Sequence, residues 1–322
     1  MTPELAHSML FQMKRIRHVE EQIAARYSEN KMRCPTHLSI GQEGVAAGVG
    51  AALRQSDFAV SGHRAHAHYL AKGGSLKAML AEIYGKETGC SKGKGGSMHL
   101  IDESVGFMGS TAIVGGTVPV GVGLGYSIKL KKTDQVSCIF LGDAVVETGV
   151  FFESINFAIL KNLPVLFVCE NNLYSVYSPM SVRQPEGRSI ANMVSGLGIE
   201  TVTADGNNVS DVFEITLSAV NSIRKHQKPK FIEFSTYRWL EHCGPNYDND
   251  LGYRSIEEFE LWREKEPISA FLKKVLDNKL IDNLNVNSID EKIKLEIEDA
   301  FNFAELSKFP PQEQAFSDLY SS

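Results

Sequence analysis

The clearest pattern of apolar and polar positions in the chain lies between residues 136 and 174. Two apolar runs, residues 136–141 and 164–169, end in Gly-Asp and in Glu-Asn-Asn, and a helix-like stretch over residues 148–160 separates them. About 30 residues is the usual length of a parallel strand–helix–strand unit. Strands that are apolar at every position are expected where helices cover both faces of a sheet. The pattern therefore predicts a parallel sheet with helices on each side.

The rest of the sequence continues this alternation. Strand-like runs and helix-like stretches follow one another at least five times, which is typical of a doubly wound α/β fold with a mostly parallel sheet. We therefore predict an α/β domain over residues 1–254 and a helical C-terminal cap over residues 255–322. Residues 176–188 are expected to form a loop. Further strands are expected at 58–61, 199–202 and 231–235, and further helices at 2–27, 45–53, 118–126, 209–225, 267–276 and 290–303.

Composition and charge limit the functions that the chain can have. Hydrophobic residues make up 43% of the 322 residues, enough for a sizeable core, and the formal net charge is −6 without a basic block. Nucleic acid is therefore not expected as a partner. The five cysteines lie far apart, with no C-x-x-C pair, which favours free thiols in a reducing compartment. No apolar run reaches about 18 residues, so we expect no membrane segment and a cytoplasmic location.

The polar residues that follow the two central strands indicate a ligand site. Both strands of a parallel unit end at the same sheet edge, so Asp143 and Asn172 are expected side by side, where open α/β sheets bind ligands. A carboxylate, an amide oxygen and a nearby backbone carbonyl suit Mg²⁺, and the following N–H groups of Ala144 and Val145 favour phosphate. The same residue types are ordinary turn formers. Their spacing and the strands on both sides favour a metal-bound diphosphate instead.

Charged and titratable residues after the strand at 58–61 offer two interpretations. Arg64 lies at the strand end, where a guanidinium can bind a phosphate through two hydrogen bonds; the alternative is a surface salt bridge. His63, His66 and His68 suggest a zinc site, but a helix would place only the first two on one face. The phosphate interpretation is therefore favoured over the zinc interpretation.

Two other histidines are candidates for acid–base chemistry. His242 follows the strand at 231–235 on a loop, and catalytic residues concentrate on loops at such positions. His37 stands alone before a small-residue helix, and a lone histidine is more often structural than catalytic.

At this point the sequence resembles a known family. Gly142-Asp143, followed by Asn171-Asn172, resembles the fingerprint of thiamine diphosphate enzymes. The segment "GDAVVETGVFFESINFAILKNLPVLFVCENNLYSVYSP" is similar to the alpha subunit of the first component of 2-oxo acid dehydrogenase complexes of the pyruvate, branched-chain and acetoin types. The resemblance covers residues 4–310. Ala144 stands where the fingerprint has its second glycine; alanine adds one methyl group and can keep φ negative, so we expect the change to be tolerated.

The resemblance implies thiamine diphosphate as the cofactor, with Mg²⁺ bound by Asp143, Asn172 and the backbone carbonyl of Tyr174. His37 falls at the mouth of the cofactor site. His242 falls where the family binds the carboxylate of a 2-oxo acid and assists acyl transfer, so both histidines are expected to be catalytic. The residues expected to bind the cofactor are His63, Arg64, Val114 (through its backbone carbonyl), Gly142, Asp143, Ala144, Val145 and Asn172.

The loop that carries His242 departs from the family at two positions. Glu241 replaces a glycine, and Cys243 replaces a serine that is phosphorylated in some relatives. We therefore predict that this chain lacks that phosphorylation switch.

As a function, the resemblance implies the alpha subunit of an enzyme that decarboxylates or cleaves a small 2-oxo acid or acetoin and transfers the acyl group to a lipoyl domain. Such enzymes need a buried glutamate on the pyrimidine nitrogen, and 322 residues leave no room for a second α/β domain that could present it. We therefore expect a beta subunit, an α2β2 assembly, and a lipoyl-bearing acyltransferase as a further partner. Two alternatives stay open: a carboligase or decarboxylase subunit that does not use lipoate, and a non-catalytic member of the fold.

Overall fold

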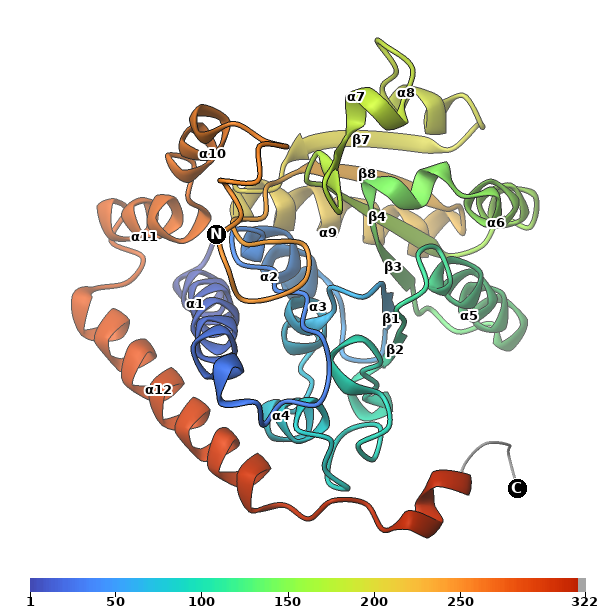
Figure 1. Ribbon diagram of the computed structural model, residues 1–322. Coiled ribbons are helices and arrows are strands. Elements are labelled where there is room, and N and C mark those ends of the chain that lie inside the picture. Colours follow the sequence, from blue (N-terminus) through green and yellow to red (C-terminus); the bar gives the residue numbers. More distant parts are fainter. Residues whose placement is uncertain (318–322) are drawn as a thin grey trace.

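A parallel sheet of six strands forms the centre of the protein in the computed structural model, which describes residues 1–317 (Figure 1). Its strands are β1 (Phe58–Ser61), β2 (Phe107–Ser110), β3 (Ser137–Gly142), β4 (Val165–Asn171), β7 (Glu200–Asp205) and β8 (Lys230–Ser235). They lie in the order β2-β1-β3-β4-β8-β7, and all neighbours are parallel. The predicted α/β fold and every strand expected from the sequence are confirmed. The edge strand β2 was not expected.

Helices cover both faces of this sheet, and their bounds are α1 (Pro3–Arg26), α2 (Glu43–Ala52), α3 (His66–Ala71), α4 (Leu76–Ile83), α5 (Thr117–Lys131), α6 (Gly149–Leu160), α7 (Met180–Arg183), α8 (Ile190–Ser195), α9 (Val209–His226), α10 (Ile256–Arg263), α11 (Pro267–Asp277) and α12 (Asn283–Leu306). The first helix begins as the sequence indicates, because the Thr2 side chain caps the N–H of Leu5. Among residues 1–317, no helix combines the length and the apolar character needed to cross a bilayer.

The two faces of β3 show why the central strands are apolar at every position. Cys138 and Phe140 face the layer that contains α2 and α9, whereas Ile139 and Leu141 face the layer that contains α5 and α6. None of these four side chains is more than 3% exposed. Because burial of apolar surface contributes about 25 cal/mol per Å², both faces of the sheet hold helices in place.

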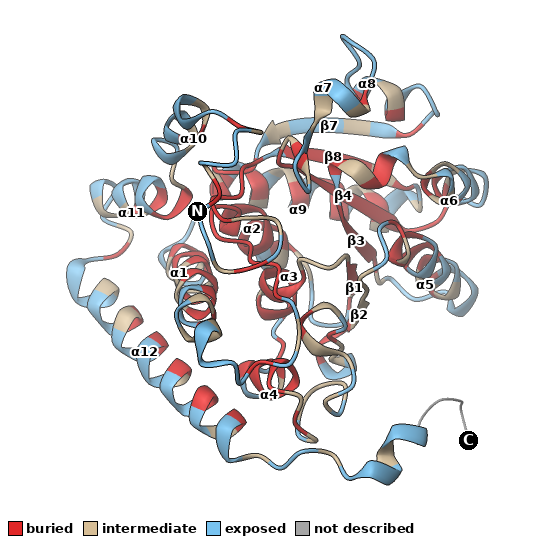
Figure 2. Ribbon diagram, viewed as in Figure 1, coloured by how far each residue is buried: buried red, intermediate tan, exposed pale blue. Residues whose placement is uncertain are grey.

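The C-terminal helices lie outside the layer formed by α2 and α3. One side of α12, which includes Ile293 and Phe301, is buried against α1 and α4, and Figure 2 shows this buried stripe beside an exposed outer side. The expected C-terminal helices at residues 267–276 and 290–303 are thus present. The division into a domain of residues 1–254 and a cap of residues 255–322 stays a prediction, and residues 318–322 lie outside the described part of the chain.

Residues 176–188, which the sequence predicts to be a loop, contain regular structure. Two short antiparallel strands, β5 (Tyr174–Ser175) and β6 (Ser178–Pro179), form a hairpin that leads into α7. Arg183, at the end of α7, donates hydrogen bonds to Asp143 and Glu147. These polar contacts with a distant turn hold the segment in place. Because no apolar face is buried there, the sequence shows no period that would predict the helix.

The helix expected over residues 118–126 is α5, and it packs both on the helix α6 and on the sheet. A Cβ atom on Gly121 would lie 2.3 Å from a carbon of Ile139 and 2.9 Å from a carbon of Val60. A Cβ atom on Gly123, in contrast, would have no atom within 4 Å. A glycine at position 121 therefore permits the close approach of helix and sheet, and the outer side of α5 is open.

The same substitution at these two glycines should have opposite effects. Gly121→Ala forces the side chains of Ile139 and Val60 to move, and such overpacking costs about 1–3 kcal/mol. Gly123→Ala adds a methyl group in open space and gains helix propensity, worth up to about 1 kcal/mol. Urea unfolding of both variants should therefore show a lower free energy of unfolding for Gly121→Ala alone. Equal values for the two variants would contradict the helix–sheet contact.

Candidate active site

The predicted site residues surround one cavity at the carboxyl edge of β1, β3 and β4. The cavity has a volume of about 210 Å³. Its lining comes from segments far apart in the sequence and includes every site residue expected above: His37, His63, Arg64, Val114, Gly142, Asp143, Ala144, Val145, Asn172, Tyr174 and His242. The fold therefore brings all of these residues together, while the role of each one stays a prediction.

The two central strand ends present oxygen atoms next to one another. Asp143 is 3% exposed and Asn172 is 8% exposed, and both line the cavity. The Asn172 amide is held on both sides: its Nδ2 donates to Gln42 Oε1 at 3.0 Å, and its Oδ1 accepts from the backbone N–H of Tyr174 at 3.2 Å. A carboxylate, a fixed amide oxygen and a neighbouring backbone carbonyl form the kind of donor set that hard divalent cations prefer.

A cationic side chain already contacts this edge. Arg183 forms an ion pair with Asp143 and a second one with Glu147, whose oxygen lies 2.5 Å from the guanidinium. Burial raises the pKa of the Asp143 carboxyl above its usual value, and Arg183 opposes this shift. The buried carboxylate thus attracts a positive charge within the chain itself, which supports the fit of a metal cation at this position.

The turn after β3 continues as a 3₁₀ segment, η4 (Asp143–Glu147), and α6 begins after it. Ala144 lies in this segment with a negative φ, as predicted for the residue that replaces the second glycine of the fingerprint. Its backbone therefore needs none of the conformational freedom that only glycine offers.

Arg64 joins two segments at the wall of the cavity. Its guanidinium donates to the backbone carbonyls of Leu38 and, at 3.1 Å, of His242. The alternative of a surface salt bridge is wrong, because the side chain is partly buried and its partners are carbonyl oxygens. Burial lowers the pKa of Arg64 to about 10, so the group is charged at neutral pH. Its contact with a diphosphate stays a prediction.

Three histidines converge beside Arg64. The ring centroids of His37, His63 and His242 lie 4.7, 5.0 and 5.2 Å from one another. Burial, with a smaller effect of the Arg64 charge, lowers their pKa values to about 2, 4 and 3. All three imidazoles are therefore neutral at neutral pH. His37 is 7% exposed, and its Nδ1 has no hydrogen-bond partner within the described residues, an arrangement that costs about 1–3 kcal/mol when a polar atom is buried.

His66 and His68, which the sequence suggested as zinc ligands together with His63, each have a separate carboxylate partner. His66 lies 3.3 Å from Glu20, and His68 lies 3.0 Å from Glu170. Glu20 and Glu170 come from segments distant in the sequence. For this reason the sequence next to the two histidines shows no carboxylate. His68 also lies 2.8 Å from the Ser61 hydroxyl, and these two residues and Glu170 form a polar floor of the cavity.

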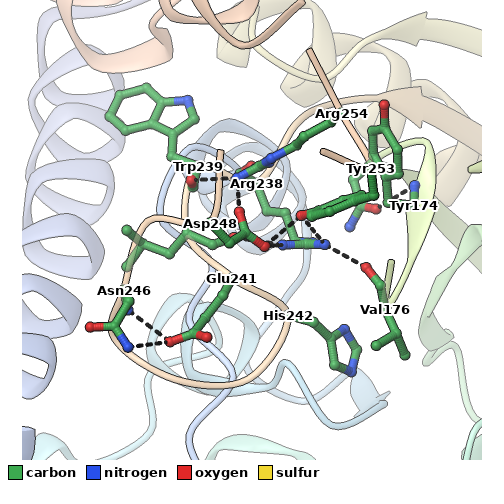
Figure 3. Close-up of polar contacts among 12 residues, drawn as sticks. Tyr174, Val176, Arg238, Trp239, Glu241, His242, Asn246, Asp248, Tyr253 and Arg254 are labelled. Atoms are coloured by element: carbon green, nitrogen blue, oxygen red, sulfur yellow. Dashed lines mark hydrogen bonds and ion pairs between the residues drawn. The ribbon is translucent and has the colours of Figure 1, made fainter. Parts of the chain in front are cut away.

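The loop that carries His242 is held by buried arginines (Figure 3). Arg238 donates to the carbonyl of Val176 at 2.7 Å, and Arg254 donates to the carbonyl of Trp239 at 2.9 Å. Asp248 forms ion pairs with both arginines. His242 lies outside this network and reaches the cavity. Contacts of the two arginines with Asp248 and with backbone carbonyls therefore fix the loop, while the side chain of His242 is available to a ligand.

Glu241, the other departure in this loop, has a local structural role. Its carboxylate accepts hydrogen bonds from the backbone and the side chain of Asn246, at 2.9 and 2.8 Å. The neighbouring Cys243 is exposed. The absence of a phosphorylation switch stays a prediction.

Sequence reasoning missed several residues of the cavity. Gln42 lies within the Gly-Gln-Glu-Gly motif, which predicts the start of a helix but gives no sign of a contact with Asn172. Met98 lies in a stretch without a periodic pattern, and so does Arg183, which is outside the cavity lining but donates to Asp143. A strand end identifies the residues that directly follow it, but no local signal predicts side chains that reach the same point from elsewhere.

Comparisons with known proteins identify the family of this chain. The dehydrogenase E1 component family matches residues 11–313. The pyruvate dehydrogenase E1 component subunit alpha of Rickettsia bellii is 33% identical over 305 residues, which cover 95% of this chain and 92% of the relative. The alpha subunit of acetoin:2,6-dichlorophenolindophenol oxidoreductase of Bacillus subtilis is 36% identical over 324 residues, which cover 100% of this chain and 95% of the relative.

A plant relative shows the same similarity. The chloroplastic pyruvate dehydrogenase E1 component subunit alpha-3 of Arabidopsis thaliana is 34% identical over 311 residues, which cover 95% of this chain and 72% of the relative. The family match and the coverage of both chains lead to one conclusion: this chain belongs to the family of dehydrogenase E1 components.

Proposed function

We propose that the chain is the alpha subunit of a thiamine diphosphate-dependent dehydrogenase first component that acts on a small 2-oxo acid or on acetoin. Membership of the E1 family implies the cofactor. The observation that carries the proposal is the single cavity in which paired oxygen donors of two strand ends face three neutral histidines. The names of the relatives, which refer to pyruvate and acetoin enzymes, support the substrate class.

Each part of the cavity has a defined task in this proposal. Asp143, Asn172 and the carbonyl of Tyr174 would hold Mg²⁺, and η4 and Arg64 would hold the diphosphate. The bound cofactor supplies a nucleophilic thiazolium carbon that adds to the ketone of the substrate. The chain's own contribution is to orient the diphosphate, to exclude water and to place proton donors and acceptors.

His37 and His242 are proposed as the acid–base groups. A neutral imidazole offers both an N–H donor and a nitrogen acceptor, so each ring can donate a hydrogen bond to a substrate oxygen and accept a proton from it. The burial that depresses their pKa values keeps both rings neutral at neutral pH. It also makes them weak bases, so a bound ligand that stabilises the imidazolium is needed before either ring takes up a proton efficiently. His63, which touches both rings, completes the wall.

A beta subunit is proposed to complete the site. In this family a partner subunit supplies the glutamate that acts on the pyrimidine ring, and the alpha-subunit names of the relatives imply such a partner. The outer side of α5 and α6 offers a surface for it, next to the cavity rim at Val114. Its apolar residues are between 38% and 69% exposed: Val120, Tyr126, Leu130, Phe157 and Leu160. Covering them would favour the α2β2 assembly through burial of apolar area.

The acceptor of the acyl group defines a second candidate function. A lipoyl-bearing acyltransferase is the partner expected for a dehydrogenase complex. The name of the Bacillus relative, however, refers to a dye as electron acceptor, so a subunit that works without lipoate is the alternative. Turnover with lipoamide and an acyltransferase, compared with turnover with the dye alone, separates the two.

All five cysteines are free thiols, which supports a cytoplasmic location.

The isolated chain should be inactive. Without the partner's glutamate the proposed site is incomplete, so we expect no 2-oxo acid decarboxylation by the chain alone and clear turnover after the beta subunit is added. Carbon dioxide release with pyruvate and with other small 2-oxo acids measures both. Strong turnover by the chain alone would refute the proposed division of the site.

Asp143→Asn should weaken the binding of thiamine diphosphate with Mg²⁺ by at least about tenfold, or about 1.4 kcal/mol, because a charged oxygen ligand is lost. Isothermal titration of the αβ complex measures this. Asp205→Asn is the matched control, because Asp205 ends β7 at the same sheet edge but lies outside the cavity. Equal affinities of the two variants would show that Asp143 does not hold the metal.

The neutral histidines should make the fold sensitive to acid. Their pKa values of about 2, 4 and 3 in the folded chain lie below the value of about 6.5 in unfolded chains. The unfolded state therefore binds more protons once the pH falls below about 6.5, and each histidine lowers the free energy of unfolding by at most about 1.4 kcal/mol per pH unit. The stabilisation is complete above that pH.

Urea unfolding at pH 7.5, 5.5 and 4.5 measures this dependence. Replacing His37, His63 and His242 by glutamine should make the free energy of unfolding depend less steeply on pH. The control His226→Gln, at an exposed position of α9, should leave this pH dependence unchanged. An unchanged slope in the triple variant would mean that these histidines are not held neutral in the fold.

A further inference from the structure

We propose that His37, His63 and His242 form a binding site for a divalent transition metal of the Zn²⁺ class, distinct from the oxygen donors at the strand ends. Each histidine offers one ring nitrogen, and these nitrogens lie within 4.8 Å of one another. The inference concerns metal binding by the chain itself and does not depend on the proposed function.

The geometry requires only small ring movements. Zinc–nitrogen bonds of about 2.0–2.1 Å in a tetrahedral site place the nitrogens roughly 3.3 Å apart, so the ring nitrogens must approach one another by up to about 1.5 Å from their separations of at most 4.8 Å. All three side chains are carried by irregular segments: His37 precedes α2, His63 follows β1, and His242 lies on the loop after β8. Rotation of these side chains into the cavity that they line is therefore possible without any change in the sheet.

The ring nitrogens are available for a metal. His37 Nδ1 is buried and lacks a hydrogen-bond partner within the described residues, and a buried polar atom without a partner calls for an explanation. The contacts of His37 with the other two rings are edge contacts between aromatic groups. His66 and His68, in contrast, face the carboxylates of Glu20 and Glu170, so they are not available.

The chemistry of the donors selects the metal. Imidazole nitrogen suits Zn²⁺, Cu²⁺ and Ni²⁺, whereas Mg²⁺ prefers oxygen ligands. The nearby charge of Arg64 opposes the binding of any cation, and the buried Glu20 and Glu170 partly balance it. Three histidines with a fourth position open to the cavity match the three protein ligands and open fourth position of catalytic zinc sites. We therefore assign nitrogen-preferring metals to the histidine cluster and Mg²⁺ to the strand ends.

Occupation of this site has a functional consequence. A bound Zn²⁺ uses the nitrogen lone pairs of His37 and His242 and fills the mouth of the cavity. It also ties together three segments that are separate in the sequence. Zinc should therefore stabilise the folded chain and block the two histidines proposed for acid–base chemistry.

In the test, Zn²⁺ is titrated into the full chain in the presence of excess Mg²⁺ and in the absence of thiamine diphosphate. We expect one Zn²⁺ per chain, with no displacement by Mg²⁺, and a rise of the melting temperature relative to chain in chelator. His37→Asn, His63→Asn and His242→Asn should each weaken binding by at least tenfold. His226→Asn, at an exposed position on α9, is the control and should bind as the unchanged chain does.

Several results would overturn the proposal. Zinc binding that is absent, or that is equal in all four variants, would exclude the cluster. Binding that Mg²⁺ displaces, or that Asp143→Asn abolishes, would place the metal at the strand ends instead. A second measurement avoids the variants and their possible folding defects: Zn²⁺ should protect His63 and His242, but not His226, from diethyl pyrocarbonate in the unchanged chain. Unprotected cluster histidines would refute the site, and none of these outcomes bears on turnover with the beta subunit.

Discussion

The parallel pairing of β3 with β4 is the constraint on which the whole site depends. All six residues of β3 pair with β4, from Ser137 opposite Val165 to Gly142 opposite Glu170, and the chain passes from each strand directly into a polar turn. Asp143 and Asn172 therefore flank one point on the sheet edge. A shift of one residue would exchange the side chains that pack against the two helix layers, so the packing that fixes the register also fixes the distance between the two oxygen donors.

A second set of contacts brings the catalytic candidates to that edge. Backbone N–H groups of the loop 239–244 donate to carbonyls of the segment 36–40 at 3.0 and 2.9 Å. These bonds place His37 beside His242, although about 200 residues separate them in the sequence. Gly41 follows with φ +99°, and a Cβ there would lie 2.5 Å from the backbone oxygen of Tyr237, just before the loop, and 2.7 Å from the Trp239 ring, so only glycine allows the two segments to approach so closely.

The sequence could predict those parts of the site that follow from local order. The apolar runs place β3 and β4, and each run identifies the residue that follows it, so Asp143 and Asn172 could be named in advance. Arg183 could not, because it reaches the site from a segment held by ion pairs rather than by a buried apolar face. The histidine cluster could be predicted only as separate residues, because long-range backbone bonds and the Arg64 contacts bring them together.

Burial acts on the two kinds of donor in this cavity in opposite directions. It raises the pKa of the Asp143 carboxyl and lowers those of the imidazoles, and both shifts favour the neutral form. Only the carboxylate has a cationic partner, Arg183, which opposes its shift. The histidines have Arg64 as a neighbour, which strengthens theirs. The placement of two arginines thus favours a negative charge where a metal would bind, and neutral nitrogen where protons would move.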